Sequence, residues 1–234
     1  MKPWLTEHYG NPSSLYRIGR AAKEALNDAR TVVGKCLNAA EPVNEKNDYA
    51  PGEIVFTGGG SQADNLAIRG FMHGPSSKGR KHIITSKIEH HAVLRSCQYL
   101  ESLGYEVTYL DVDDYGLVSA KEVVHALRED TTLVSVMTGN NEIGTIEPIA
   151  DIGAQLRARG IAFHTDAVQA VGQIPLSMMR LPVDYLSASA HKFHGPKGVG
   201  FLYARKNQDL SSFIHGGSQE RGKRAGTENV AGIV

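Results

Sequence analysis

A lysine in the C-terminal third of the chain stands where it could act as a nucleophile. Lys192 ends the segment Ser189-Ala190-His191-Lys192, which follows a β-rich run and precedes a glycine-rich turn. Most lysines are solvated, whereas partial burial among small residues lowers the pKa of a lysine and favours its attack on a carbonyl group. The sequence therefore predicts a partly buried, Schiff-base lysine, with a basic hairpin turn as the ordinary alternative.

A glycine-rich turn offers a place for a phosphate group. Residues 57–61 read Thr-Gly-Gly-Gly-Ser and separate a β-rich run from a helical pattern. Backbone N–H groups and the helix dipole converge on an anion at such a turn. Gly58-x-Gly60-x-x-Ala63 also fits the fingerprint of a nicotinamide dinucleotide site, but the acidic residue expected about 20 positions later is missing. The pattern favours a phosphate cup for a mononucleotide-sized cofactor, with a ligand-free turn and a nicotinamide oxidoreductase as alternatives.

Three more polar segments follow β-rich runs. They are Glu89-His90-His91, Asn140-Asn141-Glu142 and His164-Thr165-Asp166, the last with Gln169 close behind it. Taken singly, they are typical of surface histidines and turn-forming Asx residues. A buried Asp166, however, costs free energy unless it meets a cation such as a protonated ring nitrogen. Ligands of open α/β sheets bind where the strands end, so we expect His90, Asn141 and Asp166 in one site.

Four histidines raise the alternative of a zinc site. They are His90, His91, His191 and His194. These ligands would have to come from two separate loops, and neither loop has the HExxH spacing of a zinc enzyme. We therefore expect no metal site.

Alternating β-rich and helical patterns predict an α/β fold that brings the polar segments together. The β-rich runs cover residues 54–56, 82–85, 106–112, 133–138, 161–165, 183–187, 199–204 and 211–215. The helical patterns cover residues 13–39, 61–70, 92–103, 119–127 and 148–159, and a last helix begins at Asn229. Such alternation is typical of βαβ units and a mostly parallel sheet, to which the last runs add an antiparallel edge strand.

Composition and charge narrow the classes of function. The 234 residues include 25 Lys plus Arg and 25 Asp plus Glu, so the net charge is zero and we expect no nucleic-acid partner. No apolar run approaches the ~20 residues of a membrane span. The two cysteines, Cys36 and Cys97, lack CxxC spacing, which argues against a disulfide framework. We expect a soluble protein of the reducing cytoplasm, with an exposed polar loop at 41–52.

Together the polar segments meet the needs of pyridoxal 5'-phosphate: a lysine for its aldehyde, a carboxylate for its ring nitrogen and a helix N-terminus for its phosphate. From about Tyr9 onward, the sequence also resembles the NifS/IscS-like cysteine desulfurases of the class V aminotransferase superfamily. The motifs that carry the resemblance are Gly10-Asn11-Pro12-Ser13-Ser14, Glu89-His90-His91-Ala92-Val93, Asn140-Asn141-Glu142-Ile143-Gly144, His164-Thr165-Asp166-Ala167-Val168-Gln169, Ser189-Ala190-His191-Lys192 and Arg224-Ala225-Gly226-Thr227-Glu228-Asn229. The resemblance implies a three-layer α/β sandwich with a mostly parallel mixed sheet, the large domain of the fold-type I pyridoxal-phosphate-dependent transferases.

The resemblance also implies a role for each site residue. Lys192 would bond covalently to the cofactor and later move the Cα proton, while His90 would stack on the ring and take part in proton transfer. Asp166 would pair with the ring nitrogen, Gln169 with the phenolic oxygen, and Asn141 with the ring substituents or the substrate. The phosphate would be held by Gly60, Ser61, Ser189 and His191.

The reaction implied by the resemblance converts L-cysteine to L-alanine and passes the sulfur to an enzyme cysteine as a persulfide, for iron–sulfur cluster or thio-cofactor assembly. In the family this cysteine lies beyond the motif that holds Thr227, and Thr227 is expected to reach the phosphate of the partner subunit in a homodimer. We expect neither Cys36 nor Cys97 to be catalytic. The chain would be a fragment, with an N-terminal segment at 1–40, a cofactor-binding large domain at 41–234 and no small C-terminal domain.

Related alternatives stay open at this point. Selenocysteine lyase shares these motifs, and a truncated relative could bind the cofactor without turnover. A sulfur acceptor or an iron–sulfur scaffold protein is a further expected partner. The phosphate loop departs from the family pattern, since Gln62 stands where relatives have an acidic residue, and we expect a less preorganised cup there.

Overall fold

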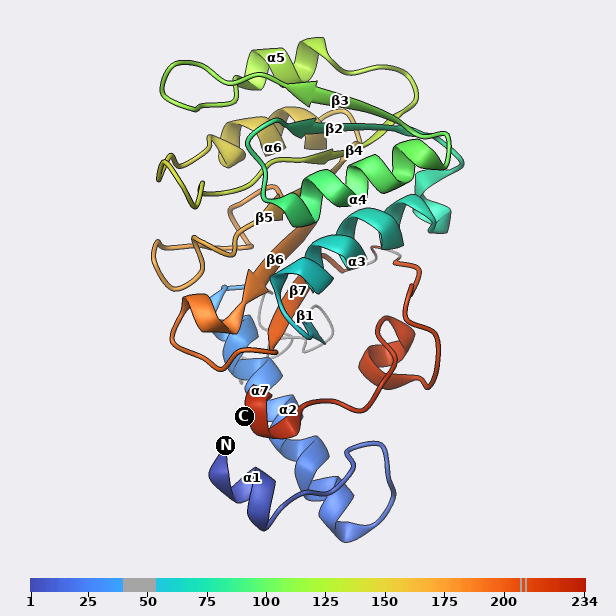
Figure 1. The fold of residues 1–234 in the computed structure, drawn as a ribbon, viewed down its shortest axis with the longest axis vertical. Helices are drawn as coiled ribbons and strands as arrows, with labels where there is room; N and C mark the ends of the chain where they lie inside the picture. Colours follow the sequence, from blue (N-terminus) through green and yellow to red (C-terminus); the bar gives the residue numbers. More distant parts are fainter. Residues whose placement is uncertain (40–53, 207, 209) are drawn as a thin grey trace.

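The computed structural model describes residues 1–39, 54–206, 208 and 210–234, so the loop expected at 41–52 lies outside the described residues (Figure 1). The strands are β1 (Ile54–Thr57), β2 (His82–Ser86), β3 (Glu106–Leu110), β4 (Thr131–Ser135), β5 (Ala162–Asp166), β6 (Tyr185–Ser189) and β7 (Gly200–Ala204). The α-helices are α1 (Lys2–Thr6), α2 (Arg17–Cys36), α3 (Gly60–Met72), α4 (His91–Ser102), α5 (Ala120–His125), α6 (Ile149–Arg157) and α7 (Val230–Ile233). Short 3-10 turns are η2 (Pro75–Ser77), η3 (Ala190–Lys192) and η4 (Gln219–Gly222).

The described strands form one mixed sheet in the order β1-β7-β6-β5-β4-β2-β3. The pairs β2–β3, β2–β4, β4–β5 and β5–β6 are parallel. β7 is antiparallel to both of its neighbours, β6 and β1. The prediction that this antiparallel strand lies at the edge of the sheet is therefore wrong. β7 pairs with a strand on each side, and β1 forms the edge. As a result, the carboxyl ends of β1, β2, β4, β5 and β6 share one edge of the sheet.

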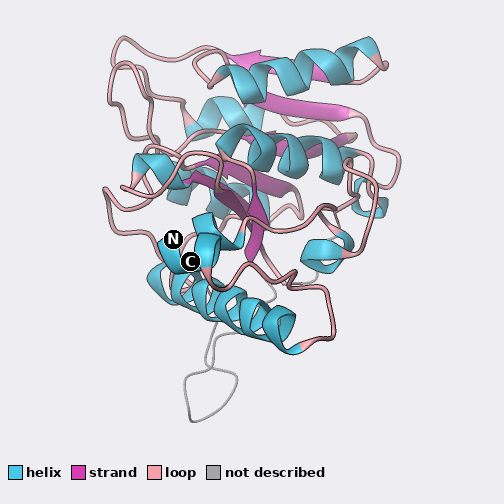
Figure 2. Ribbon diagram, turned by 60° about the horizontal axis from the view of Figure 1, so that its bottom comes forward, coloured by secondary structure: helices cyan, strands magenta, loops and turns pink. Residues whose placement is uncertain are grey.

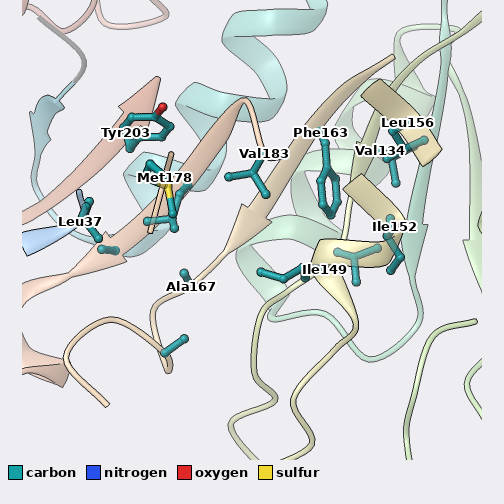
Figure 3. Close-up of a cluster of buried hydrophobic side chains, with 14 of the residues drawn as sticks. Leu37, Val134, Ile149, Ile152, Leu156, Phe163, Ala167, Met178, Val183 and Tyr203 are labelled. Atoms are coloured by element: carbon teal, nitrogen blue, oxygen red, sulfur yellow. The ribbon is translucent and has the colours of Figure 1, made fainter. Parts of the chain in front are cut away.

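Helices cover both faces of this sheet, as Figures 1 and 2 show. Successive strand residues point to opposite faces, so Val55 packs toward α3 and α4 while Ile54 packs on the opposite side. Figure 3 shows the second cluster, in which Phe163 and Val134 of the sheet lie beside Ile152 of α6. The predicted three-layer α/β sandwich with a mostly parallel sheet is confirmed.

A smaller apolar cluster joins the two ends of the chain. Ala22 and Leu26 of α2 pack with Val230 of α7, and Figure 1 shows α1 and α7 beside α2. Asn229 caps α7 through its Oδ1, which accepts a hydrogen bond from the Gly232 N–H at 3.1 Å. The helix predicted to begin at Asn229 is confirmed.

The first long helix begins later than its apolar pattern predicts. It starts at Arg17 rather than near residue 13, because Asn11 organises a turn instead. The Oδ1 of Asn11 accepts a hydrogen bond from the Ser13 N–H at 2.9 Å. The five-residue helix α1 was not predicted, since it is too short for a periodic pattern. None of the described helices combines the length and apolar character that crossing a membrane requires.

The strand predicted at 211–215 is wrong. All five residues are described, and they form a loop along the end of α3. The Ser211 N–H donates to the Gly70 carbonyl at 2.9 Å, and Phe213 packs against the cluster beneath α3 and α4. The apolar residues of this segment therefore cover a helix end instead of pairing with β7.

Strand β7 approaches the turn after β1 at one glycine. Gly200 pairs with Thr57 on one side and with Ser189 on the other. A Cβ at this position would lie 2.6 Å from the Ala188 carbonyl oxygen and 2.7 Å from backbone atoms of Gly59. Glycine at this position therefore lets the turn after β1 come close to the end of β6.

We expect Gly200→Ala to destabilise the protein by about 1–3 kcal/mol, the usual cost of overpacking, and to weaken the binding of inorganic phosphate at the turn after β1. Urea unfolding and phosphate titration measure the two effects. Gly34→Ala in α2 is the matched control, because no described atom beyond the neighbouring backbone of α2 lies within 4 Å of its added Cβ and alanine favours a helix. A Gly200→Ala protein as stable as the wild type would contradict the prediction.

Candidate cofactor site

A cavity of about 180 Å³ lies at the carboxyl edge of the sheet. The segments that follow β1, β2, β4, β5 and β6 line it, so residues far apart in the sequence meet there. Every residue predicted for the cofactor site lines this cavity except Thr227. The predicted residues that line it are Gly60, Ser61, His90, Asn141, Asp166, Gln169, Ser189, His191 and Lys192. Thr227 is exposed on the loop before α7, and its contact with a partner subunit stays a prediction.

The N-terminus of α3 forms one wall of the cavity. Gly59 precedes it with φ 144°, a backbone conformation that favours glycine. No described side chain caps this helix, so the N–H groups of its first turn are left for another acceptor. The Oε1 of Gln62 accepts a hydrogen bond from the Gly58 N–H, which restrains the turn even though Gln62 carries no charge. This wall fits a phosphate group.

The end of β6 brings a serine, a histidine and the lysine to the same cavity. Ser189 is buried, and its Oγ hydrogen-bonds the Nδ1 of His191 at 3.0 Å. Lys192 ends the 3-10 turn that follows. The expectation that Lys192 is partly buried is wrong, because this turn lies at the rim of the cavity and the described residues leave the lysine exposed.

Asp166 is the buried carboxyl of the cavity. It is 4% exposed, and its Oδ1 accepts a hydrogen bond from the Val168 N–H at 2.9 Å. Burial raises the pKa of Asp166, while the Val168 N–H and the charges of His90 and Lys192 oppose the rise. A protonated ring nitrogen beside Asp166 would stabilise its ionised form. The aspartate therefore fits the nitrogen end of a pyridine ring.

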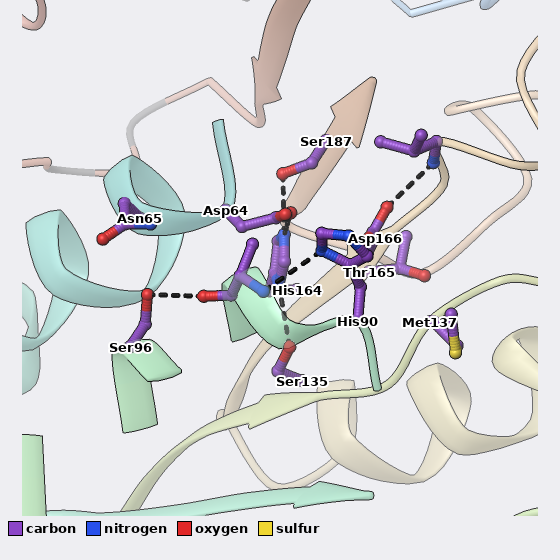
Figure 4. Close-up of polar contacts among 12 residues, drawn as sticks. Asp64, Asn65, His90, Ser96, Ser135, Met137, His164, Thr165, Asp166 and Ser187 are labelled. Carbon is purple, nitrogen blue, oxygen red and sulfur yellow. Dashed lines mark hydrogen bonds and ion pairs between the residues drawn. The ribbon is translucent and has the colours of Figure 1, made fainter. Parts of the chain in front are cut away.

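His90 is held at the cavity as the N-cap of α4. Its Nδ1 accepts a hydrogen bond from the Ala92 N–H at 3.1 Å (Figure 4), so the neutral ring carries its hydrogen on Nε2. The preceding Glu89 is buried, and its Oε1 accepts from Ser86 Oγ at 2.9 Å and from the Met137 N–H at 2.8 Å. Burial raises the pKa of Glu89 to about 8. Glu89 thus ties the turn that carries His90 to the segment after β4.

Asn140 shapes the loop that presents Asn141. Its Nδ2 donates to the Ile88 carbonyl at 2.9 Å, and its Oδ1 accepts from the N–H groups of Glu142 and Ile143 at 2.8 and 3.1 Å. Asn141 is exposed and lines the cavity. Of the two adjacent asparagines, one therefore holds the loop and the other faces the site.

The histidines weighed as zinc ligands do not come together as a ligand set in the described part of the chain. His90 and His191 line the cavity, whereas His194 lines a separate apolar groove beside Cys36. Neither cysteine lines the cavity. Cys97 is buried in α4, and burial raises the pKa of its thiol to about 12.

Three further residues line the cavity that sequence reasoning missed: Asp64, Met137 and Val168. Asp64 lies one helical turn after Gly60, on the same face of α3. Its signal in the sequence was a single acidic residue, flanked by Ala63 and Asn65, in a helix whose buried face is otherwise apolar.

Comparison with known proteins gives the family. The family described as Aminotransferase class-V matches residues 1–234, the whole chain. The chain belongs to the class-V aminotransferase family. This membership agrees with the resemblance described above and with a lysine and an aspartate in one cavity at the carboxyl edge of the sheet.

This class-V aminotransferase chain is similar to curated proteins named Cysteine desulfurase IscS. The protein of Dictyoglomus turgidum is 54% identical over 234 residues, and that of Methanosarcina thermophila is 53% identical. The matches cover 100% of this chain but 57% and 55% of those proteins. The chain therefore spans somewhat more than half the length of these relatives.

Two solved structures share the fold over nearly all of the class-V chain. A structure described as a NifS-like protein has a TM-score of 0.91 and 42% sequence identity, covering 99% of this chain and 61% of its own. A structure described as SspA in complex with cysteine has a TM-score of 0.91 and 40% identity, covering 99% of this chain and 64% of its own.

Proposed function

We propose that the chain is the cofactor-binding part of a pyridoxal-phosphate-dependent cysteine desulfurase, with an N-terminal segment at 1–40 and a large domain at 41–234. One observation carries this proposal. A helix N-terminus that no described side chain caps, the amine of Lys192 and the buried Asp166 line one cavity. The names of the curated relatives, and the cysteine in the SspA structure, support L-cysteine as the substrate.

Several residues of this chain would hold the phosphate. The first turn of α3 offers the N–H groups and hydroxyl of Gly60 and Ser61, and Ser189 and His191 contribute from the end of β6. Thr227 acts on the second subunit of a homodimer, since it is exposed and does not line the cavity of its own chain. The remaining polar groups of the cavity are then left for the ring and the substrate.

When bound, pyridoxal 5'-phosphate supplies an aldehyde for covalent attachment and a ring that withdraws electrons from the substrate Cα. Asp166 keeps a proton on the ring nitrogen, and Gln169 and Asn141 hydrogen-bond the polar ring substituents and the substrate. Lys192 provides the amine for attachment and then moves the proton at the substrate Cα. His90, with its hydrogen on Nε2, is the second group that can move a proton.

The overall reaction converts L-cysteine to L-alanine. The carbon–sulfur bond breaks as the sulfur bonds to an enzyme thiolate, which becomes a persulfide. The electron pair of the broken bond stays with the substrate carbon, which takes up a proton. Cys36 and Cys97 are not this thiolate, since neither lines the cavity. The persulfide sulfur then passes to an acceptor, such as an iron–sulfur scaffold protein, and we place this activity in the cytoplasm.

Chemical trapping tests the proposal. The protein is incubated with pyridoxal 5'-phosphate and treated with borohydride, which reduces a carbon–nitrogen double bond, and its peptides are mapped by mass. We expect the cofactor mass on Lys192. Labelling spread over surface lysines, or tight binding of a nicotinamide dinucleotide instead, would overturn the proposal.

A further inference from the structure

Asp64 is a buried acid with an oxygen that lacks a partner. The residue is 1% exposed on α3 and lines the cavity. Among the described residues, no group hydrogen-bonds its Oδ1. Buried polar atoms almost always have a partner, so an exception in a binding cavity needs a physical explanation.

Asp64 lies near two other carboxyl groups, those of Asp166 and Glu89. One oxygen of Asp64, one oxygen of Asp166 and one ring nitrogen of His90 all lie within 4.8 Å of one another. After burial, the charge of Asp166 is the next cause that raises the pKa of Asp64, because ionising two buried carboxyl groups this close together costs a large free energy. Glu89, on the turn before α4, raises the pKa of Asp64 further once it is itself ionised, and its own pKa is about 8. The two aspartates are therefore expected to share a proton.

His164 does not supply a compensating positive charge. Its Nε2 lies 3.7 Å from the Oδ1 of Asp64, and its ring is fully buried. Burial lowers the pKa of His164 to about 3, so the ring is neutral. Ser135 Oγ and Ser187 Oγ hydrogen-bond its two nitrogens at 2.8 and 2.9 Å (Figure 4). Both ring nitrogens of His164 therefore have neutral hydrogen-bond partners. The ring needs no charge, and it provides none to Asp64.

The shared proton belongs on Asp64 rather than on Asp166. Asp166 is stabilised as a carboxylate by the Val168 N–H, by His90 and by Lys192. For Asp64, burial and then the charge of Asp166 raise the pKa well above its usual value, and only a hydrogen bond with Ser187 opposes the rise.

We propose that Asp64 is a positioning residue of the cofactor site, a neutral acid that leaves Asp166 as the single carboxylate facing the ring nitrogen. This inference rests on the proposed function for the identity of the ring. The protonation of Asp64 itself concerns the protein without cofactor and is testable alone.

The first test is the pH dependence of stability without cofactor. An acid whose pKa is raised on folding binds its proton more tightly in the folded state, so stability is greatest below the unfolded pKa and is lost as the pH rises toward the folded one. Asparagine does not ionise, so Asp64→Asn removes this loss of stability at high pH. We expect it to raise the Tm by roughly 5 °C at pH 8 and by less than about 1 °C at pH 4. Equal destabilisation at both pH values would mean an ionised structural aspartate and would overturn the proposal.

The second test is the pH titration of the visible absorption of the cofactor-loaded protein. Ionisation of Asp64 adds a negative charge beside Asp166, so we expect an alkaline spectral step in the wild type that Asp64→Asn lacks. Glu147→Gln is the matched control, because Glu147 is a buried acid with a raised pKa that does not line the cavity. It should change the pH dependence of stability but leave the spectral titration unchanged. An unchanged titration in Asp64→Asn would overturn the positioning role. If no cofactor binds to the wild type, the proposed function fails while the first test still decides the protonation of Asp64.

Discussion

Lys192→Ala is expected to abolish the covalent attachment of pyridoxal 5'-phosphate. The variant removes the amine but leaves the phosphate wall at α3 and the carboxylate of Asp166 in place. The cofactor should therefore still bind, but it should be lost on dialysis and lack the visible band of the bound form. Turnover of L-cysteine by the active enzyme should fall by at least about 10²–10⁴-fold, the usual contribution of a positioned proton-transfer group.

Lys197→Ala is the matched control for this prediction. Lys197 is an exposed lysine five residues further along the same loop, and it does not line the cavity. It should leave the visible band, the retention of cofactor and the turnover unchanged. A Lys192→Ala protein that keeps its visible band through dialysis would show that another amine attaches the cofactor.

Glu220→Ala is expected to cost about 3–5 kcal/mol of unfolding free energy, because it leaves a buried guanidinium unpaired. Arg30 of α2 donates to both carboxylate oxygens of Glu220 at 2.7 Å, and both side chains are almost fully buried. Glu220 also accepts a hydrogen bond from the Phe56 N–H of β1 at 2.8 Å. The total free energy of unfolding of a domain is only about 5–15 kcal/mol. Urea unfolding should therefore show a large loss of stability.

A second variant separates the buried charge from the loss of packing. Arg30→Met combined with Glu220→Ala removes both charged groups, so it should be more stable than Glu220→Ala alone. The Arg30 guanidinium also lies 4.7 Å from the centre of the Phe56 ring, a contact that methionine replaces in part. If the double variant is less stable than Glu220→Ala, the buried, unpaired charge of Arg30 is not the cause of the stability that Glu220→Ala loses.

The segments at the carboxyl ends of strands were predictable because their signals are local. The glycine turn at 57–61, the position of His90 between a strand and a helix, and the strand that ends at Asp166 each follow from a few neighbouring residues. Alternation of strands and helices then placed them at one edge of a sheet. The alternation also predicted an α/β fold with a mostly parallel sheet, whereas the three-layer arrangement was implied by the family resemblance.

Long-range pairing could not be predicted in the same way. The contact between Arg30 and Glu220 spans 190 positions, and neither residue differs in type from a solvated surface charge. Phe213 looked like part of a strand because its pattern is apolar, and only the position of α3 shows that it covers a helix. The exposure of Lys192 likewise depends on which segments cover the rim of the cavity. The residues near Lys192 in the sequence do not determine this.

The pairing of β1 with β7 has a consequence for the order in which the protein becomes functional during synthesis. The first strand of the sheet finds its neighbour only after the last strand has left the ribosome, which takes on the order of ten seconds at ordinary elongation rates. Until then the turn after β1 lacks Gly200 and Ser189 beside it. A nascent chain should therefore be unable to capture the cofactor before the described sheet is complete, so cofactor capture would follow the completion of this sheet rather than assist its start.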